Sequence, residues 1–397
     1  MNNNPNLPRK FDAILGGSVP PPIEGVVLGG IEGVKSRLKS TVVEARVAAV
    51  CEAINYGEVG LDVVIEALKD AEKQVQRSAS QLLRERGGFK GKQTLLNYDP
   101  WLFFTTLQNW KAEEFNPEIG ITDPNNKAYV VNLGQLKLLL QDPKITEVEA
   151  LICQMDRLYY SNRDFYNWTQ ILADAHQQLN NLKALFIGDT EEDAYKECEI
   201  SHIRLGDISL VLDAYPNLEV LQVRGDSDCL ECASLSHDHL KTLIIETGNI
   251  TEQAIGQICT LNIPALEYFE LWLGKAENNY YSVSTNRLLP VLHGDSFPNL
   301  NYLGVRNSEY TGDIAFEVVQ SPMIERLAVL DLSMGDLVDA KAEALLNCPA
   351  INRLHTLNVS MNNLSPNMIQ QLSQLNCRVI AEPQDSYRYD RFYPAWE

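Results

Sequence analysis

The stretch LEVLQVRG at residues 218–225 is one of seven segments in which apolar residues occupy the same positions. In each segment the first, fourth and sixth residues are apolar, and the third, fifth and seventh point to the opposite face of an extended chain. No single segment can bury its apolar face alone, so we expect the segments to stack around a shared core. The other six are LKALFIGD from Leu182, LKTLIIET from Leu240, LEYFELWL from Leu266, LNYLGVRN from Leu300, LAVLDLSM from Leu327 and LHTLNVSM from Leu354.

The seven segments begin 22 to 36 residues apart, close to the roughly 20–29 residues of a leucine-rich repeat. An eighth segment, VEALICQM from Val148, fits the same template, so eight strands of this kind are predicted. Helical stretches such as VDAKAEALLNC and SPNMIQQLSQLN separate the strands. This alternation predicts an α/β fold, a curved leucine-rich repeat solenoid of the ribonuclease-inhibitor type, with a parallel sheet inside and helices outside.

A second repeat, with a period of 30 residues, precedes the solenoid. The stretches LKSTVVEARVAAVCEAINYG and LKDAEKQVQRSASQLLRERG place apolar residues at helical spacing. Each copy ends at a glycine, Gly57 or Gly87, where a left-handed cap is sterically free. Two copies are fewer than the roughly three that a repeat array needs to stand alone. We therefore expect a small all-α module that docks on the next domain of the chain.

Short sequence motifs in both repeats resemble those of known families. Leu68 to Asp70, Val75 to Arg77, Ala79, Leu82 and Leu83 resemble HEAT-like repeats, in particular those of bilin lyases of phycobilisome biogenesis and of cyanobacterial multidomain proteins. From about residue 125 onward, the pieces KECEISHI, ALEYFELWLG, FPNLNYLGVRNSEY and LDLSMGDLVDAKAEALL are similar to an uncharacterised family of bacterial leucine-rich repeat proteins. That second resemblance implies a fold and no assigned activity.

The repeats and the junctions between them predict five regions. These are an N-terminal arm or cap (1–25), HEAT-like helices (26–92), a junction and solenoid cap (93–140), the solenoid (141–380) and a C-terminal cap (381–397). The junction contains the aromatic-rich stretch YDPWLFFTTLQNW, whose aromatic residues are expected to pack in a core.

Charge is distributed unevenly along the chain. Residues 1–92 hold 13 basic against 11 acidic residues, a balance of +2, and residues 93–397 hold 20 against 42, a balance of −22. The acidic part should repel nucleic acid and anionic membrane surfaces, so we expect a protein partner, with the oligomeric state left open. The eight cysteines are scattered, and we see neither a signal peptide nor an apolar run of the ~20 residues that span a membrane. These features predict a cytoplasmic protein.

The outward positions of the strands define the predicted concave face. Seven of them form a contiguous stripe across four neighbouring strands: Arg224, Glu246, Tyr268, Glu270, Trp272, Tyr302 and Arg306. Aromatic residues and arginine are enriched at binding hot spots, so this stripe is the candidate partner-binding site. The alternative is that the aromatic rings cover the sheet while the charges pair among themselves.

The sequence offers little sign of catalysis. The motifs of a nucleophile elbow, a phosphate loop and a dinucleotide-binding turn are absent, so we predict a non-enzymatic scaffold or adaptor without a cofactor. Cys229 and Cys232, near Cys198, His237 and His239, are interpreted as loop thiols rather than a zinc or redox site. The alternative function, suggested by the HEAT-like resemblance, is that of a bilin or tetrapyrrole lyase or chaperone.

Overall fold

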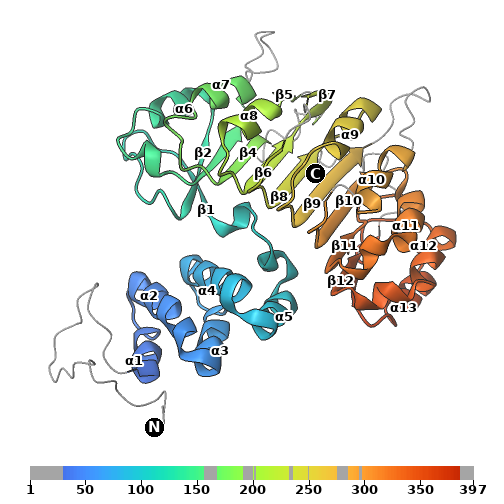
Figure 1. The fold of residues 1–397 in the computed structure, drawn as a ribbon, viewed down its shortest axis with the longest axis horizontal. Coiled ribbons are helices and arrows are strands. Elements are labelled where there is room, and N and C mark those ends of the chain that lie inside the picture. The colour runs from blue at the N-terminus through green and yellow to red at the C-terminus, as the bar shows by residue number, and fades with distance from the viewer. Residues whose placement is uncertain are drawn as a thin grey trace. The chain divides into compact units, whose positions relative to one another are not determined.

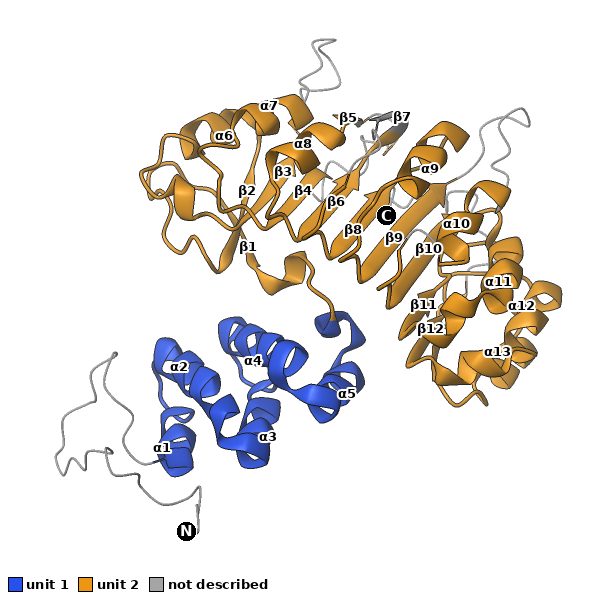
Figure 2. Cartoon of the chain, in the orientation of Figure 1, with its two compact units in different colours: residues 1–103 blue, residues 104–397 orange. Residues whose placement is uncertain are grey.

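A computed structural model describes residues 30–155, 168–190, 200, 203–231, 236–248, 250–274, 285–294 and 297–384. The chain forms two compact units, residues 1–103 and 104–397 (Figure 2). The boundary therefore falls after Phe103, later than the predicted boundary at residue 92. The reason is that the helix Gly88–Tyr98 and the 3₁₀ turn Pro100–Phe103 pack against the helices before them. Across the described residues, no helix is both long and apolar enough to cross a membrane.

The first unit is a stack of helices. They are α1 (Gly30–Arg37), α2 (Val43–Ala53), α3 (Gly57–Ala67), α4 (Lys73–Arg86) and α5 (Gly88–Tyr98). Consecutive helices pack together, and α2 also contacts α4 while α3 contacts α5, which is the pattern of stacked helix pairs. Arg46 of α2 holds the loop after α3 through two bonds to Asp70, Nε to Oδ2 at 3.0 Å and Nη2 to Oδ1 at 3.1 Å.

The two glycines expected to cap these helices behave differently. Gly57 takes a positive φ of 62°, although its ψ of −142° differs from that of the predicted left-handed cap. Gly87 has a φ of −74°, and its neighbour Gly88 takes the positive value instead, 59°. Gly87 is nevertheless required by packing, since a Cβ there would lie 2.4 Å from the carbonyl oxygen of Leu83. The pair of glycines lets α5 begin directly after α4.

The second unit contains a parallel sheet of eleven strands that follow one another along an arc (Figure 1). In spatial order they are β1 (Lys111–Glu114), β2 (Lys127–Val131), β3 (Ala150–Gln154), β4 (Ala184–Asp189), β6 (Val220–Arg224), β8 (Thr242–Glu246), β9 (Tyr268–Gly274), β10 (Tyr302–Ser308), β11 (Val329–Asp331), β12 (Thr356–Asn358) and β13 (Arg378–Ile380). Two further strands, β5 (Arg204–Asp207) and β7 (Asp226–Glu231), form a separate pair. All eight predicted segments are strands of the large sheet.

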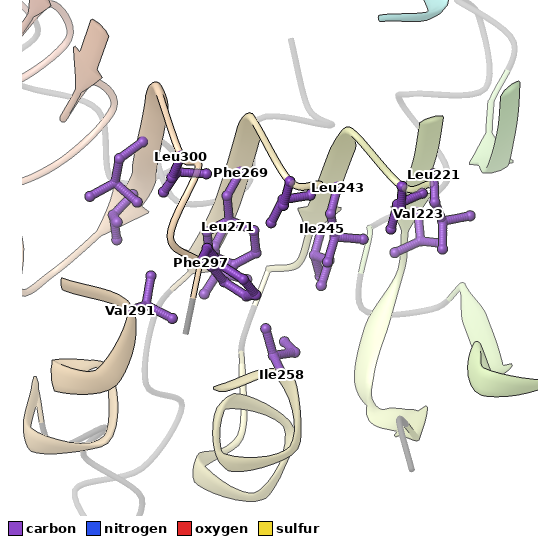
Figure 3. Packing of buried hydrophobic residues seen from close by; sticks show 14 of the residues in the cluster. Leu221, Val223, Leu243, Ile245, Ile258, Phe269, Leu271, Val291, Phe297 and Leu300 are labelled. Carbon is purple, nitrogen blue, oxygen red and sulfur yellow. The ribbon is translucent and has the colours of Figure 1, made fainter. Parts of the chain in front are cut away.

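Helices between these strands cover one face of the sheet. They are α6 (Leu133–Leu139), α7 (Trp168–Asp174), α8 (Ser209–Ala214), α9 (Glu252–Cys259), α10 (Leu289–Leu292), α11 (Thr311–Gln320), α12 (Asp339–Leu346) and α13 (Pro366–Leu372). Strand residues at the fourth and sixth positions, such as Leu243 and Ile245, point toward these helices and share one core with Ile258 of α9 (Figure 3). The unit is therefore a leucine-rich-repeat-like solenoid, with one continuous core between sheet and helices.

Three strands extend the sheet beyond the eight predicted. At the start, β1 and β2 pair in register, with Ala112 opposite Ala128 and Ala128 opposite Ala150. In the stretch TDPNNKAY only the first part turns, and Lys127 begins β2. At the other end, β13 pairs with β12. These strands lack the leucine spacing of the template because they close the ends of the array rather than repeat its middle.

Candidate interaction surface

The strand register brings the seven predicted site residues together on the helix-free face. Arg224 lies opposite Glu246, Glu246 opposite Trp272, and Trp272 opposite Arg306, so these four form one row across β6, β8, β9 and β10. Tyr268 and Tyr302 lie opposite each other in an earlier row of the same strands, and Glu270 lies between the two rows. The predicted stripe is therefore contiguous in space.

Much of this stripe is buried. Relative exposures are 3% for Tyr268, 1% for Tyr302, 3% for Glu246 and 4% for Glu270. The side chains of Arg224 and Arg306 retain 16% and 23%, and Trp272 is also half-buried. Only the row of Arg224, Trp272 and Arg306 is therefore partly open to solvent, and the binding role of the stripe stays a prediction.

Two tyrosines stack at the centre of this face. The rings of Tyr268 and Tyr302 have centroids 3.7 Å apart and are tilted by only 8°. Gly304 leaves room for the Tyr302 ring, because a Cβ at position 304 would lie 2.9 Å from Tyr302 Cε1. Burial, together with the nearby Glu270 carboxylate, raises the pKa of Tyr268 well above its ordinary value. Both hydroxyls therefore stay protonated and can donate hydrogen bonds.

Glu270 is the acceptor around which these donors gather. Its Oε1 accepts from Trp272 Nε1 and from Arg306 Nη1, each at 2.7 Å, and its Oε2 accepts from the Tyr268 hydroxyl at 2.7 Å. Burial alone would raise the pKa of this carboxyl, but the charge of Arg306 and the hydrogen bonds outweigh it and hold the pKa below its ordinary value. Glu270 is therefore a buried, ionised and fully bonded carboxylate.

The network continues into strands that the predicted stripe did not include. The Tyr302 hydroxyl lies 3.1 Å from both Glu270 Oε2 and Asp331 Oδ2, so it can donate to either carboxylate. Asn358 Nδ2 donates to Asp331 Oδ2 at 2.9 Å, which links β11 to β12. Asp331 and Asn358 occupy the fifth position of their segments, as Glu270 does in LEYFELWL. That shared position was the available sequence signal for them.

A second cluster lies on β6 and β8. Glu246 accepts from Arg224 Nε and from Gln222 Nε2, both at 2.6 Å. The Arg224 guanidinium also lies 5.4 Å from the ring centroid of Phe186, a cation–π contact. The charges of the stripe are thus paired with one another, as the alternative interpretation anticipated.

The chain itself covers the first outward row. Residues 104–110, here called the strap, run from Phe104 to Trp110 and lead into β1. Phe104 is fully buried and meets Tyr268 and Tyr302 edge-on, at centroid distances of 5.3 and 5.7 Å. The Thr242 hydroxyl donates to the carbonyl of Thr105. The strap is thus the reason that the two tyrosines are buried.

The other half of the strap lies over small residues. Leu107 and Trp110 pack against an apolar cluster on β2, β3, β4 and β6, and Trp110 Nε1 donates to Glu149 Oε2 at 3.3 Å. The cluster consists of Ala128, Ala150, Ile152, Ala184, Phe186 and Val220. The aromatic residues of this stretch are predicted to pack in a core, but the helix-free face could not be predicted as its place, because no local pattern connects residues so distant in the chain.

The histidine nearest the Cys-x-x-Cys pair has a structural role. His237 Nδ1 accepts from the Leu240 amide at 3.0 Å, which leaves Nε2 as the donor to the Tyr215 carbonyl at 3.1 Å. Burial lowers the pKa of this ring. Cys198 and Cys232 lie outside the described residues. Among those described, no cluster of three or more His, Cys, Asp or Glu could hold a metal ion.

Comparison with known proteins identifies similar folds. A protein of Bacteroides fragilis of known structure matches with a TM-score of 0.57 and 24% identity, covering 66% of this chain and 76% of that protein. An internalin from Listeria monocytogenes matches with a TM-score of 0.32 and 15% identity, over 66% of this chain and 59% of its own. No protein-family model matches the sequence, and no curated protein matches it. The first similarity supports the solenoid fold alone.

Proposed function

We propose that this protein is a non-enzymatic scaffold that binds a protein partner on the helix-free face of its solenoid. The observation that carries the proposal is the partly open row of Arg224, Trp272 and Arg306, which stands on a rigid network of paired charges. Arginine and tryptophan are the side chains that most often dominate binding energy at interfaces. Because their geometry is held by Glu246 and Glu270, little side-chain entropy would be lost on binding.

The charge of the chain limits the kind of partner. Residues 93–397 carry a balance of −22, which favours a basic or uncharged protein over nucleic acid or an anionic membrane. The helical first unit would then engage a second protein or steady the first. We also propose that this first unit is HEAT-like, that the protein is related to bacterial and cyanobacterial proteins, and that it is cytoplasmic. The alternative function, a bilin or tetrapyrrole lyase or chaperone, stays a prediction.

Site-specific photo-crosslinking in the native cell tests the proposal. A photoreactive phenylalanine analogue replaces Trp272 on the helix-free face, and in a matched control it replaces Phe316, which is 52% exposed on helix α11. We expect a discrete protein adduct from position 272 that is absent from position 316 and is lost when Arg224 is changed to alanine. Equal labelling at both positions, or none at position 272, would contradict a partner site on this face.

A further inference from the structure

The strap is bound to the sheet by its apolar side chains and by two hydrogen bonds. One runs from the Thr242 hydroxyl to the Thr105 backbone carbonyl, and the other from Trp110 Nε1 to Glu149 Oε2, just before β3. Two further backbone bonds close on the strap itself, from Asn109 N to the Thr106 carbonyl and from Trp110 N to the Leu107 carbonyl. The strap therefore lies on the sheet as a bound peptide does, without being a strand of it.

The anchors of the strap have a fixed spacing. Phe104, Leu107 and Trp110 are each three residues apart, and residues Leu107–Asn109 form a 3₁₀ turn. Since a 3₁₀ helix has three residues per turn, this spacing brings Leu107 and Trp110 to the same side, while Phe104 precedes the turn. A capping box between Thr106 and Asn109 holds the turn. The recognised feature is thus a short turn that presents an aromatic, an aliphatic and an aromatic side chain in succession.

The row beneath the strap matches these anchors. Tyr268 and Tyr302 offer a stacked aromatic surface to Phe104, and the three alanines of β2, β3 and β4 leave space for Leu107 and Trp110. The carboxylates close to this row are already paired, Glu149 with Lys183 and Glu270 with Arg306. The row therefore suits an uncharged segment with aromatic and aliphatic anchors.

We infer that this row is a docking surface for a short turn-forming segment of a partner protein with aromatic and aliphatic anchors three residues apart, and that the strap is its intramolecular competitor. The inference rests on the proposed scaffold function and adds the chemistry of the partner. A tethered competitor has a high effective concentration, so a partner binds with an apparent affinity lowered by the fraction of molecules whose strap is closed. Weakening the strap should therefore strengthen binding of a matching segment.

The test uses the full-length protein and a fluorescein-labelled peptide with the sequence of residues 102–111, LFFTTLQNWK. Fluorescence anisotropy titrations compare the wild type with Phe104→Ala and with the milder Phe104→Leu. We expect the Phe104→Ala protein to bind the peptide at least tenfold more tightly than the wild type does. A peptide in which Phe104 is replaced by alanine should lose that gain. Phe89→Ala, at a side chain that is 85% exposed in the first unit, is the matched control and should behave as the wild type.

Two measurements keep the result decisive. Circular dichroism and thermal unfolding establish that each variant is folded, and a folded Phe104→Ala protein that binds no more peptide than the wild type overturns the inference. Hydrogen exchange on the wild type needs no variant: amides of residues 105–110 should exchange faster than those of β8 and β9. Exchange of strap and strands at one common rate would mean that the strap opens only when the unit unfolds, and it would also overturn the inference.

The outcomes separate this inference from the proposed function. A partner adduct at position 272 without any binding of the peptide leaves the scaffold in place and removes the docking row. Peptide binding without an adduct at position 272 removes the partner site around Trp272 and leaves the docking row.

Discussion

Replacing Glu270 by glutamine is the sharpest test of the buried network on the helix-free face. The carboxylate accepts from Tyr268, Trp272 and Arg306, each at 2.7 Å. A glutamine amide is uncharged and has one acceptor oxygen, so it cannot accept all of these bonds, and Arg306 keeps only the more distant Asp331 carboxylate, 3.8 Å away, as an ionic partner. Breaking a buried ion pair in this way costs about 3–5 kcal/mol. We expect a loss of that size in the free energy of unfolding.

Urea denaturation followed by tryptophan fluorescence measures this loss. An unchanged m-value, the slope of the unfolding free energy against urea concentration, shows that the folded state is otherwise the same. The matched control replaces both partners, Glu270→Met with Arg306→Met. The double variant removes both charges of the pair, and the nearby Asp331 carboxylate loses Arg306 but keeps hydrogen bonds from Tyr302 and Asn358, so part of the loss should be recovered. A cost below about 1 kcal/mol for Glu270→Gln, the range of exposed ion pairs, would refute the buried network.

The wild type and Glu270→Gln should also differ in how their unfolding free energy depends on pH. The folded-state pKa of Glu270 is below its ordinary value of 4.5. The stability that this carboxylate contributes is therefore fully present above pH 4.5 and is lost as the pH falls through the lower, folded-state pKa. Glu270→Gln should flatten this part of the acid limb, because it carries no titrating group. An acid limb below pH 4.5 that is identical in both proteins would contradict the assignment.

Three further predictions concern the solenoid. Gly335→Ala should lower the unfolding free energy by about 1–3 kcal/mol, because its Cβ would lie 1.9 Å from Thr311 Oγ1. By contrast, Gly256→Ala should stabilise helix α9 by about 0.5–1 kcal/mol, because its Cβ would meet nothing within 4 Å. Thermal unfolding of both variants checks the pair, and equal shifts would show that the close approach is not real. His237→Gln should remove part of the pH dependence of the unfolding free energy below pH 6.5. Burial lowers the folded-state pKa of His237, so the stability that the neutral ring contributes is present above pH 6.5 and is lost as the pH falls through that lower pKa. Denaturation at pH 7.5 and pH 5 measures it, and an unaltered difference between the two pH values would count against it. Asn362→Ala should lower the unfolding free energy by about 1–3 kcal/mol. The Asn362 side chain donates to the carbonyls of Leu332, Val359 and Ser360 and accepts from the amide of Leu337. Denaturation in urea tests the prediction, and a change within experimental error would argue that water replaces these bonds.

Sequence periodicity identified the repeating strands because each strand alternates between a core face and an open face. Leu221 and Val223 point into the core while Val220 and Gln222 do not, and this alternation is a local property of the chain. The same alternation placed Arg224, Glu246, Trp272 and Arg306 in one row, which the strand register confirms. The end strands β1, β2 and β13 lack the leucine spacing of the template and were missed.

By itself, the amino-acid order determined that apolar residues recur in stacked units, that the sheet is parallel, and which side chains leave the core. Only the tertiary structure decided whether those side chains meet solvent. Phe104 covers Tyr268 and Tyr302, and Arg306 neutralises Glu270, through contacts between residues far apart in the chain. Such contacts depend on where the folded backbone returns, and a periodic pattern, which acts over a few neighbouring residues, contains no information about that return.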